Sequence, residues 1–209
     1  MPSPGEHGPA RQRLSRRLFL RSSALTTAGA AITEAASALV GQAEAADDGA
    51  SGPGPVTITM KINGVARTLR AEPRMTLAEA LRGPLGLTGT KIACNRGACS
   101  ACTVWLDGAP VCSCMMLAIE VGARSVMTIE GLAGGGELHA VQAAFIEHDA
   151  LQCGFCTPGM VMSCAALLER TPDPTAEDVE AAIAGHLCRC GTYPHVVAAT
   201  LAAAKARKA

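Results

Sequence analysis

The sequence predicts an α+β chain in which a small strand-rich region is followed by a bundle of short helices. From residue 56 hydrophobic residues alternate with period two, whereas after residue 136 they recur at helical spacing. The glycine-rich stretch 131–136 separates the two patterns and is typical of a domain boundary. Aromatic residues make up 2% of the chain and hydrophobic residues 49%, much of it alanine, which suits closely packed short helices.

The strand-rich region, residues 56–131, has the signals of a β-grasp, ferredoxin-like domain. Its first two strands flank Asn63-Gly64, which is the strongest short hairpin signal. Thr76 with Glu79 three residues later predicts a capping box that opens a short helix. Asp107-Gly108 predicts a turn after a further strand. The expected elements are strands 56–62, 65–69, 103–106 and 124–129, with a helix over 76–81.

The second region, residues 132–209, is expected to form four helices. Leu138, Val141, Ala144, Phe145 and His148 share one helical face, and a second apolar stripe follows Thr157-Pro158, interpreted as an N-cap and first helical residue. Acidic residues after Thr175 favour a third helix that is capped by this residue. Pro194 opens a fourth helix that runs to about Ala204. The second stripe consists of Met160, Val161, Cys164, Leu167 and Leu168.

Eight of the ten cysteines form two groups of four. The C-x4-C-x2-C spacing in the first group is that of a plant-type 2Fe–2S loop, because several thiolates must converge on one cluster. Zinc and disulfides remain alternatives, but a disulfide framework does not require this spacing. In the second group, each cysteine pair precedes a predicted helix, so the two turns can close one cluster between them. The groups are Cys94, Cys99, Cys102 with Cys114, and Cys153, Cys156, Cys188 with Cys190.

Spacing alone does not decide whether Cys112 or Cys114 completes the first group. Cys164 lies on an apolar helical face, where a buried thiol acts as a small hydrophobe. The glycines in or beside the cysteine turns are expected to direct backbone N–H groups toward cluster sulfurs. These glycines are Gly97, Gly154 and Gly191.

The first 45 residues have the features of a twin-arginine export signal. Arg16-Arg17 lies in an SRRLFLR motif, a weakly apolar stretch follows, and Ala43-Glu44-Ala45 is an A-x-A cleavage pattern. A transmembrane anchor is disfavoured because Glu34 and many small polar residues interrupt the stretch. We therefore expect residues 1–45 to be a signal, residues 46–55 a flexible lead-in, and the protein to be periplasmic, exported with its clusters already assembled.

The charged, aromatic and histidine residues argue against nucleic-acid binding and against further metal ligands. The chain has formal net charge +0 and few aromatics, so it lacks the basic face and stacking platforms of nucleic-acid binding. The cysteines satisfy both four-ligand sites, so the histidines are expected to have surface or helix-capping roles. They are His139, His148, His186 and His195.

The cysteine motifs also resemble a known family. The segments CNRGACSAC at 94–102, LQCGFCTPGM at 151–160 and LCRCGTY at 187–193 resemble the small iron–sulfur subunit of the xanthine oxidase family of molybdenum hydroxylases. The resemblance covers about residues 56–203 and implies two 2Fe–2S clusters, with Cys114 as the fourth ligand of the first. Ser100 stands where the family often has a second glycine.

The resemblance implies an electron-transfer role within a multi-subunit oxidoreductase. A partner large subunit would hold a molybdopterin cofactor, which Gln152 would contact, and the cluster of Cys153 would lie nearest to it. Electrons would leave through the Cys94 cluster to an FAD-binding subunit or a cytochrome. With the export signal, this indicates an aldehyde oxidoreductase; no catalytic residue or substrate site is expected on this chain. The rival hypotheses are a free-standing two-cluster ferredoxin, the small subunit of a hydroxylase of N-heterocycles, and a zinc- or disulfide-stapled module.

Overall fold

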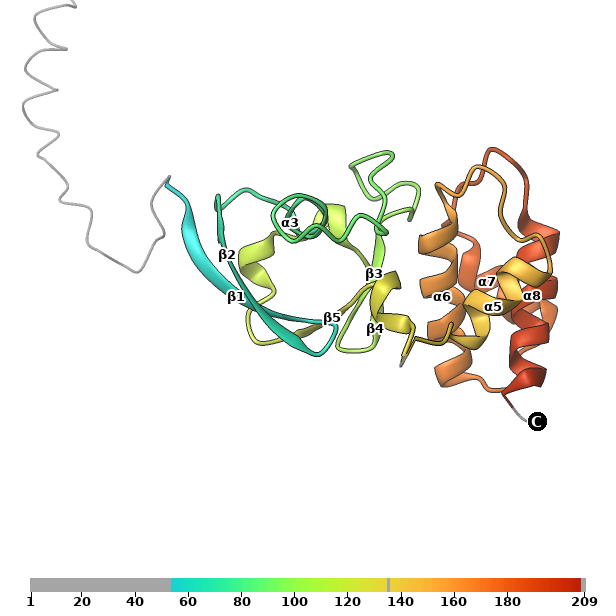
Figure 1. Ribbon diagram of the computed structural model, residues 1–209. Coiled ribbons are helices and arrows are strands. Elements are labelled where there is room, and N and C mark those ends of the chain that lie inside the picture. The colour runs from blue at the N-terminus through green and yellow to red at the C-terminus, as the bar shows by residue number, and fades with distance from the viewer. Residues whose placement is uncertain (1–53, 135, 208–209) are drawn as a thin grey trace, which may run out of the picture. The chain divides into compact units, whose positions relative to one another are not determined.

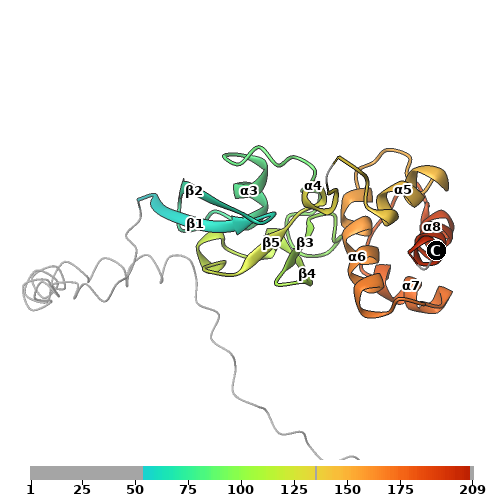
Figure 2. The same ribbon diagram turned by 60° about the horizontal axis from the view of Figure 1, so that its bottom comes forward.

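The computed structural model describes residues 54–134 and 136–207, where a mixed five-stranded sheet with one covering helix is followed by a helical bundle (Figures 1 and 2). The predicted signal, 1–45, and nearly all of the lead-in, 46–55, lie outside the described residues. The elements are β1 Val56–Ile62, β2 Val65–Ala71, α3 Leu77–Arg82, β3 Thr103–Leu106, β4 Ala109–Cys112, η2 Ser113–Met115, η3 Ala118–Glu120, β5 Ser125–Met127, α4 Ile129–Leu132, α5 Ala140–Glu147, α6 Thr157–Arg170, α7 Ala176–Ile183 and α8 Tyr193–Ala206.

The sheet has the order β2-β1-β5-β3-β4, which confirms the predicted α+β, β-grasp architecture. β1 pairs with β5 in parallel, and the other neighbours are antiparallel. The tight turn at Asn63 and Gly64, with φ of 50° and 81°, supplies the hairpin that the sequence predicts. Side chains of α3 pack against the sheet to form one core that includes Met60, Leu81 and Val104.

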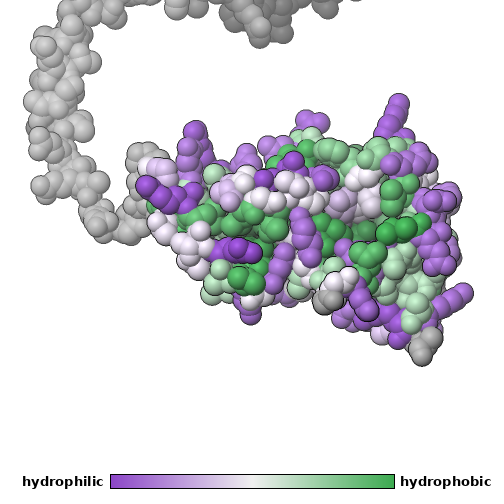
Figure 3. Space-filling model, in the orientation of Figure 1, coloured by the Kyte–Doolittle hydropathy of each residue, from purple (hydrophilic) through white to green (hydrophobic). Residues whose placement is uncertain are grey.

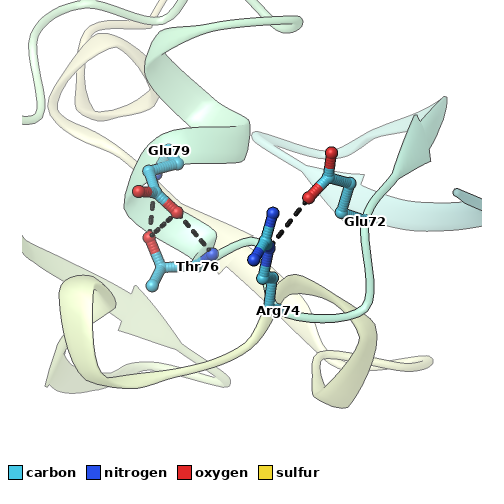
Figure 4. A network of polar contacts seen from close by, with 4 residues as sticks. All are labelled: Glu72, Arg74, Thr76 and Glu79. Carbon is cyan, nitrogen blue, oxygen red and sulfur yellow. Dashed lines mark hydrogen bonds and ion pairs between the residues drawn. The ribbon is translucent and has the colours of Figure 1, made fainter. Parts of the chain in front are cut away.

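The predicted capping box of α3 is present. Glu79 Oε2 accepts hydrogen bonds from the backbone nitrogen and the hydroxyl of Thr76, at 2.8 and 2.9 Å (Figure 4). The Thr76 hydroxyl in turn accepts from Glu79 N, so the capping box satisfies the N–H groups of both residues. The neighbouring Arg74–Glu72 ion pair in Figure 4 is largely exposed and contributes little to stability.

The strand predicted over 124–129 is shorter in the structure, where it covers Ser125–Met127, so its predicted end is wrong. β5 stops at Met127, and Ile129 begins the short helix α4. The side chain of Asn63 causes the change: its Oδ1 accepts from Thr128 N at 2.8 Å, and its Nδ2 donates to the Thr128 hydroxyl at 3.0 Å. Gly131 therefore lies in a helix rather than in a linker.

The four predicted helices are all present and form the second core. Phe145, Met160, Leu168, Val179 and Val196 are nearly or fully buried there. The expected helix starts hold within one residue. Thr175 caps α7 through its side chain, whereas α6 begins at Thr157 with Cys156 at the N-cap position and no side-chain capping hydrogen bond. The sequence predicts that Leu138 shares a helical face with Val141 and Phe145, which is wrong: Leu138 precedes α5 and is exposed.

Hydrophobic residues reach the surface over the sheet and over the helices (Figure 3). Four of the large exposed apolar side chains lie next to a cysteine or two residues from one, and they leave apolar surface beside both cysteine groups. These are Met115, Leu151, Phe155 and Leu187. In the described part of the chain, no helix is both long and apolar enough to cross a membrane.

Candidate iron–sulfur centres

The β3–β4 hairpin brings the first cysteine group together. Cys102 immediately precedes β3, and the hairpin register pairs Thr103 with Cys112 at the end of β4. The chain then turns, and Ser113 donates from its backbone nitrogen and its hydroxyl to the Cys102 carbonyl, at 3.3 and 2.6 Å. This turn places the buried Cys114 thiol beside those of Cys102 and Cys94.

Backbone N–H groups of the 94–102 loop point at the sulfurs of this group. Arg96 N and Ala98 N lie 3.4 and 3.3 Å from Cys94 Sγ, and Gly97 N lies 3.4 Å from Cys114 Sγ. The left-handed backbone at Gly97, φ +71°, makes this direction possible. Such a ring of donors offsets negative charge on thiolates, as the sequence predicted for this glycine.

Ser100 keeps the conformation that a glycine would adopt in this loop. Its φ is +55°, in the left-handed region. Its carbonyl accepts from the backbone nitrogen and the hydroxyl of Thr103, at 3.1 and 2.7 Å. The departure from the family pattern at this position therefore leaves the loop geometry in place.

The second group forms from two turns, each just before a long helix. Cys153 and Cys156 precede α6, and Cys188 and Cys190 precede α8, as predicted. The thiols interact as pairs across the turns, Cys156 with Cys188 and Cys190 with Cys153. Cys153 is exposed, so this group opens to the surface. Gly154 and Gly191, at φ +78° and +76°, supply the tight turns.

Each group contains one thiol that ionises readily and one that does not. The N–H of Arg96, followed by the Cys99 thiol, lowers the pKa of Cys94 to about 7. Burial acts to raise the pKa of Cys188, but the hydroxyl and N–H of Thr192 outweigh it and lower the pKa to about 7. Burial raises the pKa of Cys114 to about 11 and that of Cys156 to about 12. Both thiols therefore resist ionisation on their own, and a bound cation would favour their thiolate forms.

Among the described residues, one backbone hydrogen bond links the segments that carry the two groups. Leu187 N donates to the carbonyl of Cys99 at 3.2 Å. Cys99 belongs to the first group, and Leu187 directly precedes Cys188 of the second. A second hydrogen bond joins the sheet to the helices nearby: the Trp105 indole on β3 donates to the Met162 carbonyl of α6 at 2.8 Å.

The two remaining cysteines differ in their surroundings. Cys112 packs against Cys102 and Cys114 of the first group. Its sulfur lies 3.9 Å from the Ser100 hydroxyl, and both residues line a cleft of about 180 Å³. Cys164 is fully buried in the helical core, and burial raises its pKa to about 11, as suits the predicted structural thiol. The Gly97 N–H that points at Cys114 Sγ favours Cys114 as the fourth ligand, and this ligand role stays a prediction.

The histidines follow the predicted roles with one correction. His139 caps α5 by accepting from Val141 N, and the His195 ring contacts the carbonyl of His148 at 3.0 Å. His186 is wrong as a surface or capping residue: it is 4% exposed, and its Nε2 lies 2.7 Å from the Ser163 hydroxyl. No local pattern marks this contact, because its partners are 23 residues apart.

Gln152, the predicted contact to a molybdopterin, is exposed beside the exposed Cys153. In the described part of the chain, no three His, Cys, Asp or Glu side chains are arranged to hold one metal ion. The assignment to iron–sulfur clusters therefore rests on the paired thiols, the sulfur-directed N–H groups and the spacing of the eight cysteines. These features fit two such clusters, and together with the fold they define a two-centre iron–sulfur protein.

Comparison with known proteins supports this class domain by domain. Residues 60–124 match the family described as 2Fe-2S iron-sulfur cluster binding domain, and residues 128–201 match the [2Fe-2S] binding domain. The matches leave the exact predicted boundaries, 56–131 and 132–209, as predictions.

Several similar relatives are subunits of hydroxylases and oxidoreductases. The nicotine 6-hydroxylase small subunit of Paenarthrobacter nicotinovorans is 48% identical over 70% of this chain and 88% of its own length. The aldehyde oxidoreductase iron-sulfur-binding subunit PaoA of Escherichia coli O157:H7 is 37% identical over 93% of this chain and 90% of its own. A chain of quinoline 2-oxidoreductase from Pseudomonas putida 86 superposes with a TM-score of 0.71 at 44% identity, covering 74% of this chain and 96% of that one.

This chain belongs to the small iron–sulfur subunits of the xanthine oxidase family of molybdenum hydroxylases. Its homologues are parts of multi-subunit oxidoreductases.

Proposed function

We propose that the chain is the electron-transfer subunit of a periplasmic molybdenum hydroxylase that oxidises aldehydes. The observation that carries the substrate class is the extent of the match to PaoA, which covers 93% of this chain and so reaches into the predicted export segment. The nicotine 6-hydroxylase subunit matches only 70%. A shared leader supports a shared compartment and a related assembly.

The exposed Cys153 supports the proposed direction of electron flow. Around it, Gln152 and the apolar side chains of Leu151 and Phe155 are also exposed, a surface suited to a partner protein. A molybdopterin cofactor on that partner would supply substrate hydroxylation with oxygen from water. The Cys153 group would accept the electrons, and the Cys94 group would pass them to an FAD-binding subunit or a cytochrome.

A second candidate is the small subunit of a hydroxylase of N-heterocycles. It is favoured by the higher identities, 48% to the nicotine 6-hydroxylase subunit and 44% to the quinoline 2-oxidoreductase chain. Both candidates require a molybdenum partner, so they differ in substrate rather than in the role of this chain.

The decisive experiment purifies the chain with its partners from the native host. The proposal expects a red-brown complex that contains molybdenum and about four iron atoms per copy of this chain, bleached by benzaldehyde but not by nicotinate. Bleaching by nicotinate alone selects the second candidate. Isolation of a red-brown chain without a molybdenum partner indicates a free ferredoxin, and a colourless chain indicates the zinc- or disulfide-stapled module.

Replacing Arg16 and Arg17 together by lysine is expected to leave the chain in the cytoplasm. The arginine pair is the defining feature of the export motif, and lysine preserves the charge while changing the motif. Fractionation followed by immunoblotting measures the distribution. A double replacement of Arg11 and Arg13 by lysine is the matched control, and normal periplasmic levels of the Arg16/Arg17 variant contradict the export proposal.

Gln152→Ala is expected to slow cluster reduction by substrate about 10-fold in the intact complex. Loss of one hydrogen bond at a buried interface leaves its partner unsatisfied, which accounts for an effect of this size. Rapid-mixing absorbance measures the rate, and the visible spectrum verifies that both clusters assemble. Lys61→Ala, at an exposed position of β1, is the control. A wild-type rate in the Gln152 variant excludes the contact.

A further inference from the structure

The peptide group between His186 and Leu187 occupies the junction of the two cysteine groups. Its N–H donates to the Cys99 carbonyl at 3.2 Å. On the other side only one residue, Leu187, separates this peptide from the backbone of Cys188. The junction therefore supplies a connection between the two groups that consists of covalent bonds and one hydrogen bond.

The hydroxyl of Tyr193 holds the backbone on both sides of Leu187. It donates to the His186 carbonyl at 3.0 Å and accepts from Cys188 N at 2.8 Å. The His186–Leu187 peptide is thus fixed at its oxygen by Tyr193 and at its N–H by Cys99. Tyr193 itself is the first residue of α8 and half-buried, so the hydroxyl is positioned by a helix rather than by a loop.

Helix α6 holds the same segment from a second side. The His186 ring lies 2.7 Å from the Ser163 hydroxyl, and both residues are buried. One turn earlier, Gly159 lies directly against the Ser100 carbonyl of the first loop. Helix α6 therefore contacts the chain on both sides of the Cys99–Leu187 hydrogen bond, at His186 and at Ser100. Tyr193 then fixes the direction of the His186–Leu187 carbonyl.

We propose that Tyr193 is a positioning residue for electron transfer between the two clusters. Its hydroxyl orients the His186–Leu187 peptide so that the N–H reaches the Cys99 carbonyl, and this hydrogen bond couples the clusters electronically. In each step one electron leaves the reduced centre of Cys188 and arrives at the oxidised centre of Cys99, and no bond is made or broken. The inference rests on the proposed two-cluster relay.

Tyr193→Phe in the intact complex tests the proposal, because it removes the hydroxyl and keeps the ring. We expect the Leu187 amide to exchange with solvent about 10-fold faster, since its peptide loses a hydrogen bond. We also expect electron transfer between the clusters, after rapid one-electron reduction, to slow several-fold. The magnetic interaction between the two reduced clusters should weaken in parallel.

Thr200→Val is the matched control. It removes a buried hydroxyl from the same helix, but that hydroxyl donates to the Val196 carbonyl at 2.8 Å and contacts the Cys164 thiol of the helical core, and it touches neither cysteine group. This variant should keep the wild-type exchange, rate and magnetic interaction. Measured potentials of both clusters separate a change of coupling from a change of driving force.

Three results overturn the proposal: an unchanged rate in Tyr193→Phe, a fall in rate fully accounted for by the shifted potentials, or loss of either cluster from this variant. The last result would make Tyr193 an assembly residue. The wild-type complex distinguishes failure of this proposal from failure of the proposed function. A wild-type chain that holds only one cluster contradicts the proposed function itself.

Discussion

Cys114→Ser is expected to lose the first iron–sulfur centre and to keep the second. The Cys114 thiol is 5% exposed, lies beside those of Cys102 and Cys94, and accepts the Gly97 N–H. A serine hydroxyl is a poor substitute for a thiolate ligand of iron. The iron content should fall from about four to about two atoms per chain, with one of the two paramagnetic signals lost on full reduction.

Cys112→Ser is the matched control two residues away. The Cys112 side chain packs against Cys102 and Cys114, but the backbone N–H groups of the cysteine loop point at Cys94 and Cys114, and the Cys112 sulfur lies 3.9 Å from the Ser100 hydroxyl. This variant should therefore keep both centres and the wild-type iron content. If Cys112→Ser loses the cluster and Cys114→Ser retains it, the ligand assignment is reversed.

The features that the sequence predicted correctly are encoded by neighbouring residues. Asn63-Gly64 defines a hairpin by its backbone preferences, and Thr76 with Glu79 closes a capping box within one turn. The C-x4-C-x2-C spacing is likewise local, because three thiols of one loop must point inward together. The hairpin register brings Cys114 beside two of these thiols, those of Cys94 and Cys102, and its role as the fourth ligand stays a prediction.

The features that were missed depend on contacts between distant residues. The strand at 124–129 ends early because Asn63 bonds Thr128, 65 residues away in the chain. His186 lies in the segment after α7 and is buried, with its ring 2.7 Å from the hydroxyl of Ser163 on α6, 23 residues away in the chain. The Cys99–Leu187 bond that joins the centres is a backbone contact, so side-chain identity carries no signal for it. Such contacts follow from tertiary packing, which no local pattern encodes.

Gly159→Ala is expected to destabilise the described fold by about 2 to 3 kcal/mol. A Cβ at this position would lie 2.4 Å from the Ser100 carbonyl oxygen and 3.2 Å from Ala101 Cα. Both atoms belong to the backbone of the first cysteine loop. The Ser100 oxygen cannot easily move away, since two hydrogen bonds from Thr103 hold it. The methyl group would therefore push α6 away from this loop.

The sign of this effect is informative because helix propensity predicts the opposite. Within a helix, replacement of glycine by alanine is ordinarily stabilising by about 1 kcal/mol. Gly134→Ala is the control, because a Cβ there meets nothing within 4 Å. Urea unfolding followed by far-UV circular dichroism compares the midpoints of the variants. A midpoint for Gly159→Ala at or above that of the wild type would show that α6 does not pack closely on the Ser100 carbonyl. A lower midpoint, with Gly134→Ala near the wild type, places the strain at the contact that aligns the two cysteine groups.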